Sequence, residues 1–110
     1  MSPAPSTIPQ GTLDLLILRT LAVGPSHGYA IARLIEDATE DALRIEEGSL
    51  YPALHRMQRR GWIGATWARS DLGKTIKVYA LTPRGRGELR KRTADWRDLT
   101  AAVGKVLRMS

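Results

Sequence analysis

The stretch EEGSLYPALHRMQRRGWI, residues 46–63, reads as a helix with a proline near its start. Ser49 is of the residue type that caps a helix N-terminus. With Ser49 as the cap, Pro52 falls in the first turn, where backbone N–H groups have no partner within the helix and a missing donor costs little. The stretch therefore predicts a helix over about residues 49–60, with an apolar side, at about 100° per residue, made of Leu50, Ala53, Leu54 and Met57.

The opposite side of this helix is polar and basic. Side chains of these types hold phosphates and read base edges in DNA-binding proteins. An amphipathic surface helix with arginines is also common in proteins that bind no nucleic acid, so the helix alone favours a purely structural role. The residues in question are Ser49, Pro52, Arg56 and Arg59, flanked by Tyr51 and His55.

A β-hairpin is predicted directly after this helix. WIGATWAR (62–69) and IKVYALT (76–82) are rich in strand-forming residues, and SDLGKT (70–75) between them is a polar turn in which Gly73 is suited to a positive φ. The hairpin tip carries Arg69, Lys74 and Lys77. A hairpin with a basic tip is a second feature, independent of the helix, that points to DNA.

Two further helices are predicted upstream. Thr12 can cap GTLDLLILRTLAV (11–23), and Ser26 can cap HGYAIARLIEDA (27–38), with Ile31, Leu34 and Ile35 inward. After them, Leu43 and Ile45 alternate as in a short strand. Three helices followed by a hairpin is the order of a winged helix-turn-helix, a mainly α fold with a small β-hairpin (α+β), here over residues 10–82.

The first of these helices has two apolar faces. Leu13, Leu16, Ile17 and Leu21 form one, and Leu15, Leu18 and Ala22 form the other. A chain of this size rarely has a core large enough to cover both, so the second face predicts contact with a partner subunit. The alternative is a fully buried central helix.

The C-terminal segment, residues 83–110, is predicted to be one helix that pairs with a second copy of the chain. Thr82 and Pro83 form a cap followed by a first-turn proline. Apolar residues then follow heptad spacing, with Arg92 as the one polar interruption. Such a row needs another helix, either the same helix or the exposed first helix of a second subunit. The row consists of Leu89, Trp96, Leu99, Val103 and Val106.

Composition bounds the function classes. The chain has 110 residues and a net charge of +6, with three Arg against seven acids through His55 and fourteen Lys and Arg against four acids after it. Because the basic residues are concentrated after His55, a polyanionic partner is favoured. There is no cysteine, and no apolar stretch is long enough for a membrane helix, so we expect a cytoplasmic protein without a membrane partner, led by a disordered segment over residues 1–9.

Neither catalysis nor a cofactor is indicated. His27 and His55 lie in separate helix-start segments, and no metal-ligand or nucleophile spacing is present. His27 is therefore interpreted as a local structural residue, and His55 as a residue of the DNA face or of the solvent-exposed surface. We expect no enzyme, no cofactor and no metal.

Three motifs together resemble the PadR family of bacterial transcriptional regulators. They are GTLDLLILRTLAVGPSHGYAIARLIED (11–37), GSLYPALHRMQRRGWI (48–63) and YALTPRGRGEL (79–89), and the short single C-terminal helix is similar to the family's smaller subgroup. The resemblance implies a homodimeric repressor that binds an inverted-repeat operator. It also implies that Tyr29 touches the DNA backbone, that Ser49 and Tyr51 contact DNA, and that the wing is formed by Gly73, Lys74 and Lys77.

The hairpin departs from the family pattern at one place. The family has a basic, proline-containing tip followed by two tyrosines, whereas this chain has Thr75, Ile76 and Val78 and keeps only Tyr79. The contribution of the wing to DNA binding is thus the part of the resemblance that the residues support least.

Two other functions remain open: a winged helix that binds RNA, and a protein-interaction module with the same fold. The chain has no Phe to serve as a stacking surface for single-stranded RNA, and its basic groups converge on one helix and one hairpin, which favours double-stranded DNA. Trp96 is expected to pack between subunits. A sharper hypothesis is that Trp96 borders a cavity for a small planar apolar effector.

Overall fold

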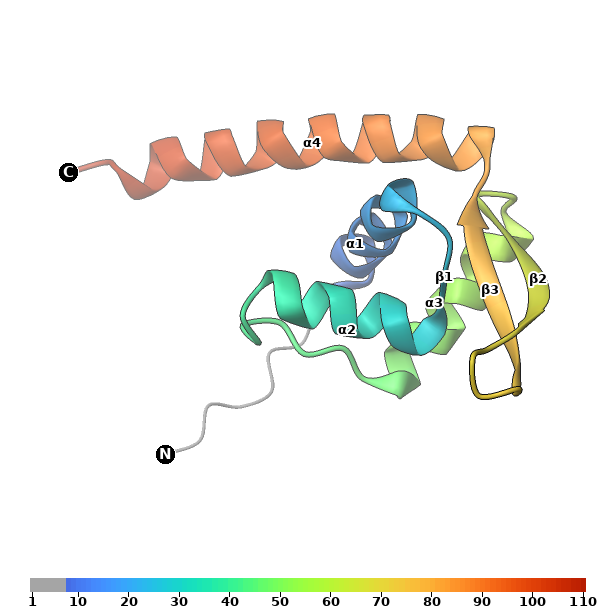
Figure 1. Cartoon of the computed structure of the whole chain (residues 1–110). Coiled ribbons are helices and arrows are strands. Elements are labelled where there is room, and N and C mark those ends of the chain that lie inside the picture. Colours follow the sequence, from blue (N-terminus) through green and yellow to red (C-terminus); the bar gives the residue numbers. More distant parts are fainter. Residues whose placement is uncertain (1–7) are drawn as a thin grey trace.

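The computed structural model describes residues 8–110, which form four helices and three strands. Helices α1 to α3 pack together, the hairpin of β2 and β3 lies at one end, and α4 crosses over α1 and runs on beyond it (Figure 1). This confirms the predicted α+β class, and none of the described helices is both long and apolar enough to span a membrane. The elements are α1 Gln10–Val23, β1 Ser26–His27, α2 Gly28–Ala38, α3 Glu47–Arg59, β2 Ile63–Arg69, β3 Thr75–Leu81 and α4 Pro83–Leu107.

The N-terminal lead expected over residues 1–9 falls mostly outside the described residues. Ile8 is partly buried and packs against the core, and Pro9 is the N-cap of α1 with φ −56° and ψ 145°. The Pro9 carbonyl accepts a hydrogen bond from the backbone N–H of Leu13 at 3.0 Å. The prediction that Thr12 caps this helix was therefore wrong, because α1 begins before Thr12.

The start of α2 also differs from the prediction. Ser26 does not cap the helix, because Ser26 and His27 form a short strand whose register with β3 is Ser26↔Tyr79 and His27↔Val78. His27 is the N-cap of α2, and no side chain caps that end. Leu34, expected to point inward, is 48% exposed, whereas Ile31 and Ile35 are buried as predicted.

Helix α3 starts earlier than Ser49. Its N-cap is Glu46, whose carbonyl accepts hydrogen bonds from the backbone N–H groups of Ser49 (3.0 Å) and Leu50 (2.9 Å). Ser49 is therefore in the first turn and Pro52 in the second, which corrects both predicted positions. The proline leaves the carbonyl of Gly48 without a helical donor, and this is tolerated because Gly48 is exposed and its carbonyl can bond water.

The core is centred on α1, which packs against α2, α3, β3 and α4. Leu18, predicted to lie on a face for a partner subunit, is completely buried within its own chain. The alternative of a central helix was thus correct at this position, and Leu15 on the same face is only half-buried. The buried core residues are Leu13, Ile17, Leu18, Leu21, Ile31, Ala32, Ile35, Leu50, Ala53, Leu54, Met57, Trp62, Ile63 and Tyr79.

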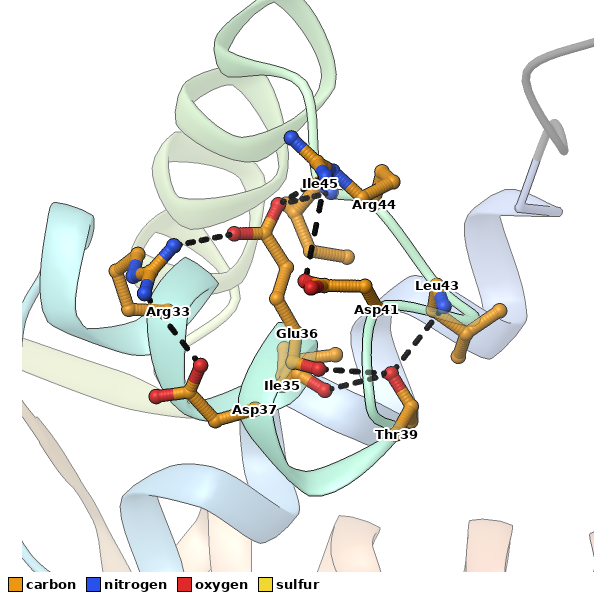
Figure 2. A network of polar contacts seen from close by, with 9 residues as sticks. All are labelled: Arg33, Ile35, Glu36, Asp37, Thr39, Asp41, Leu43, Arg44 and Ile45. Atoms are coloured by element: carbon orange, nitrogen blue, oxygen red, sulfur yellow. Dashed lines mark hydrogen bonds and ion pairs between the residues drawn. The ribbon is translucent and has the colours of Figure 1, made fainter. Parts of the chain in front are cut away.

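The loop between α2 and α3 is held by Glu36, as Figure 2 shows. One carboxylate oxygen of Glu36 accepts a hydrogen bond from the backbone N–H of Ile45 at 3.0 Å and lies 3.7 Å from Arg44. Thr39 accepts a hydrogen bond from the N–H of Leu43 at 3.2 Å. The predicted strand at Leu43 and Ile45 does not form, because these two side chains pack against the core from a loop. The loop thereby fixes where α3 begins.

The hairpin is an antiparallel pair with register from Ile63↔Leu81 to Arg69↔Thr75. Together with β1 it makes a three-stranded sheet of order β1-β3-β2. Gly73 has φ 77°, which confirms the positive φ predicted for it. The hairpin packs against the core near its base, through Ile63, Ala65, Tyr79 and Leu81, whereas Arg69 and Lys74 at its tip are exposed.

Helix α4 is joined tightly to the turn between α3 and β2. Thr82 caps it as predicted: its hydroxyl accepts a hydrogen bond from the Gly85 N–H at 3.0 Å and donates to the Gly61 carbonyl at 2.6 Å. Gly85 is buried so closely that a Cβ atom there would lie 2.0 Å from the carbonyl oxygen of Trp62. This contact requires glycine at position 85 and could not be predicted from the sequence.

Candidate nucleic-acid interface

The outer side of α3 is open to solvent over most of the residues that the sequence assigned to it. Ser49, Tyr51, Pro52, His55 and Arg59 are exposed. The inner side of the helix is fixed by Leu50, Ala53, Leu54 and Met57, all of which are buried as predicted. The helix is therefore firmly packed on one side and presents polar groups on the other.

A groove of about 350 Å³ lies between the start of α2, α3 and β3. It brings together side chains that are far apart in the sequence, including both histidines of the chain. The proximity of these side chains could not be predicted from the sequence, because it depends on the pairing of β1 with β3. This pairing places His27 beside the hairpin. The lining residues are His27, Gly28, Tyr29, Tyr51, His55, Ile76, Lys77 and Tyr79.

Tyr51 is positioned by a close contact with Gly28. A Cβ atom at Gly28 would lie 2.8 Å from Cε1 of the Tyr51 ring and 3.1 Å from its hydroxyl oxygen. Glycine at this position thus lets the ring lie against the start of α2. The contact joins two of the motifs described above, the one over residues 11–37 and the one over residues 48–63.

Lys77 and Tyr79 form the hairpin side of the groove. The Lys77 ammonium lies 5.6 Å from the centre of the Tyr79 ring, within range of a cation–π interaction. Burial, and to a smaller extent the neighbouring Tyr51, raise the pKa of Tyr79, which keeps its hydroxyl neutral. The positive charge of Lys77 therefore has no anionic phenolate beside it.

The tip of the hairpin is held by its own polar groups. Arg69 donates a hydrogen bond to the Gly73 carbonyl at 3.1 Å, and the backbone N–H of Lys74 donates to the Ser70 hydroxyl at 3.1 Å. The side chain of Lys74 is exposed. Trp67 and Leu72 are also strongly exposed on the hairpin, which the sequence analysis did not single out.

Arg56 does not belong to the outer side of α3. Its guanidinium forms an ion pair with Asp14 of α1 at 2.5 Å, and the two side chains are only 17% and 3% exposed. The prediction that Arg56 lies on the outer side of the helix was wrong, because the long side chain turns inward to a buried carboxylate. Asp14, an acid within the apolar run LDLLIL (13–18), was the signal that could have predicted such a partner.

Arg92 of α4 completes this buried polar cluster. It lies 4.0 Å from Asp14, forms a 2.9 Å ion pair with Glu88, and stacks over the Trp62 ring at 4.8 Å. Burial raises the pKa of Asp14, and the guanidinium groups of Arg56, Arg92 and Arg60 offset this only in part. The cluster therefore joins α1, α3 and α4 at some electrostatic cost.

The apolar row of α4 divides into two parts. Leu89 packs against the core of its own chain, so the prediction that it faces a partner helix is corrected. Beyond it the row is open, with Trp96 44%, Leu99 57%, Val103 46% and Val106 64% exposed. Leu15 of α1 lines a cleft of about 270 Å³ between α1 and the middle of α4.

Three helices followed by a hairpin, with the third helix exposed along one side, define a winged helix-turn-helix protein. Residues 17–91 match the model of the transcriptional regulator PadR-like family. The chain therefore belongs to this family of transcriptional regulators, which confirms the resemblance seen in the motifs.

Relatives of known sequence or structure agree with this assignment. The chain is 34% identical to the transcriptional regulator Rv3488 of Mycobacterium tuberculosis, over 89% of this chain and 85% of the relative. A PadR family transcriptional regulator from Eggerthella lenta is 33% identical, with a TM-score of 0.79 and coverage of 92% of this chain and 86% of the other. A transcriptional regulator from Clostridium thermocellum is 28% identical, with a TM-score of 0.80 and coverage of 87% and 93%.

Proposed function

We propose that the protein is a repressor that binds an inverted-repeat operator as a homodimer. Helix α3 enters the major groove, and the β2–β3 hairpin contacts the flanking DNA. Residues 10–82 act as the DNA-binding part and residues 83–110 as the dimerisation helix. The observation that carries the proposal is the continuous surface formed by the outer side of α3, the groove beside it and the basic hairpin.

The residues proposed to contact DNA lie on three parts of the surface: α3, the groove beside it and the hairpin tip. Ser49, Tyr51, His55 and Arg59 lie on or beside the outer side of α3, and Pro52 contributes the surface of its ring. Tyr29 and Lys77 border the groove, from which they reach the sugar-phosphate backbone. Arg69, Gly73 and Lys74 form the hairpin tip, where Gly73 supplies the turn and the two cations supply charge.

A second copy of the chain is the partner proposed for the exposed row of α4. Trp96, Leu99, Val103 and Val106 form an apolar strip at heptad spacing, which another copy of the same helix would cover. The cleft beside Leu15 is continuous with the middle of α4 and offers a further contact for the partner. Symmetric pairing would present two α3 helices to half-sites about 34 to 36 Å apart, or a multiple of that distance.

Trp96 is proposed to pack between the two copies. The alternative role, as one wall of a cavity for a planar apolar effector, predicts that such compounds quench tryptophan fluorescence in a Trp96-dependent way and lower operator affinity. If a broad panel of planar aromatic compounds does neither while DNA binding is intact, Trp96 is an interface residue alone.

The decisive experiment is selection of bound fragments from random and genomic duplex DNA with the purified protein. An enriched inverted repeat supports the proposal and supplies the half-site. Binding of RNA with no enrichment of duplex DNA would replace operator binding with the RNA-binding alternative. A monomer at micromolar concentration by light scattering, together with occupancy of single half-sites, would reject the homodimer.

A further inference from the structure

The groove beside α3 holds both histidines of the chain, and they come from different elements. His27 is the last residue of β1 and the N-cap of α2, while His55 is on the exposed side of α3. The His27 and Tyr29 rings meet edge to face with their centres 6.4 Å apart, which restricts the orientation of the imidazole. Two imidazoles thus share one groove on the proposed DNA-binding surface.

The other ionisable side chains that line the groove are three tyrosines and one lysine. From α2 the groove receives Tyr29, from α3 Tyr51, and from β3 Lys77 and Tyr79. None of its lining residues is acidic. Glu36 and Glu47 line a neighbouring groove, together with Arg33 and Arg44, and the two grooves share Tyr29 and Tyr51.

We propose that this groove is a binding site for a DNA backbone phosphate, in which His27 and His55 donate hydrogen bonds as imidazolium ions beside Lys77. The inference rests on the proposed binding of duplex DNA and adds that this binding takes up protons. Histidine is the side chain whose charge changes between about pH 5 and pH 8. A phosphate favours the protonated imidazole, because that form carries a positive charge and two N–H donors.

The sign of the pH dependence follows from linkage. If the bound state holds more protons than the free protein, affinity for DNA rises as pH falls and weakens as pH rises. Each proton taken up changes the dissociation constant by at most about tenfold per pH unit. We expect binding to weaken by roughly tenfold or more between about pH 6 and pH 8 at constant salt.

The test uses the full chain and a fluorescently labelled duplex of random sequence, because non-specific binding already depends on phosphate contacts. Affinity is measured at pH 6 and pH 8, near the two ends of the range in which histidine titrates. Proton uptake by the unaltered protein is measured independently by calorimetry in two buffers of different ionisation enthalpy. His27→Gln, His55→Gln and the double variant remove the titrating groups and keep an amide donor. Arg97→Gln on α4 removes one positive charge elsewhere.

If both histidines bind the phosphate, DNA binding takes up protons in the unaltered protein and in Arg97→Gln. The uptake is smaller in each single histidine variant and absent in the double variant. Absence of DNA binding at both pH values would reject the proposed function itself. Binding with equal affinity at both pH values and no proton uptake would leave DNA binding in place and overturn the phosphate site. Full uptake in His27→Gln, or persistent uptake in the folded double variant, would equally overturn the two-histidine site.

Discussion

The two halves of α4 belong to one continuous helix and differ in what covers them. The first half is fixed to its own chain: Gly85 lies against the Trp62 carbonyl, Leu89 packs against the core, and Arg92 lies beside Asp14. The second half extends past α1 (Figure 1). Its apolar row, from Trp96 onward, is exposed.

This difference shows that one series of apolar residues at heptad spacing can serve two separate surfaces. The first part of the series stabilises the fold of a single chain, and the remainder is available for a second helix. Helix α3 has a similar division, because Arg56 is used inside the fold whereas Arg59 is exposed. Substitutions in the two kinds of surface should therefore have separable effects on folding and on assembly.

Gly85→Ala should have the largest effect, a loss of about 3 kcal/mol in the free energy of unfolding. The new methyl group would meet the backbone carbonyl of Trp62, which cannot move without separating α4 from the core. Gly87→Ala is the matched control, because only the far end of Arg90 comes within 4 Å of a Cβ there. The control should gain about 0.5 to 1 kcal/mol from helix propensity. Denaturant unfolding measures the free energy of unfolding of both variants. Equal stabilities would contradict the close packing of α4 against Trp62.

Asp14→Asn should cost about 2 to 3 kcal/mol, because it leaves the mostly buried guanidinium of Arg56 without its counter-ion. Since burial keeps the pKa of Asp14 raised despite its cationic neighbours, the pair itself adds little net stability. Replacing both partners, Asp14→Leu with Arg56→Met, should therefore restore stability close to that of the unaltered protein. Thermal unfolding measures both effects.

The same double variant tests the role of Arg56 in DNA binding. If Arg56 acts only inside the fold, the stable double variant should bind duplex DNA with unchanged affinity and salt dependence. A large loss of affinity in a fully folded double variant would restore Arg56 to the DNA-binding surface.

Trp96→Ala should weaken dimerisation by roughly tenfold to thirtyfold and leave the fold of each chain intact. The exposed row loses its largest member, whereas the docked first half of α4 is untouched. Sedimentation at several concentrations measures the dimer, and circular dichroism monitors the fold. Lys105→Ala, off the apolar row on the same helix, is the control. Equal dimerisation of the two variants would place the interface elsewhere.

Lys74→Ala and Lys77→Ala should have the smallest effects, each weakening DNA binding by about 1 kcal/mol or less without changing stability. Each should also lower the slope of log affinity against log salt by about one, for all DNA sequences alike. Fluorescence anisotropy at several salt concentrations measures both quantities. Unchanged affinity and slope in both variants would show that the hairpin is not part of the DNA-binding surface. This test matters because the hairpin differs from the family pattern at Thr75, Ile76 and Val78.

The four helices, the hairpin and the buried side of α3 could be predicted from the sequence, whereas β1 could not. Periodicity predicted the buried residues of α3, strand-forming runs around Gly73 predicted the hairpin, and Thr82 with Pro83 predicted the start of α4. These features depend on local backbone preferences and on the repeat of a helix or strand, both of which can be read from neighbouring residues.

The inward turn of long side chains and the contacts between distant groups depend on the tertiary structure. The ion pair of Arg56 with Asp14 and the groove shared by His27 and His55 join residues from different elements. The contact of Gly85 with Trp62 likewise depends on how α4 docks. Spacing along the chain fixes the direction of a Cβ atom, but a flexible arginine can reach either side of its helix, and the approach of two elements is set by packing across the whole core.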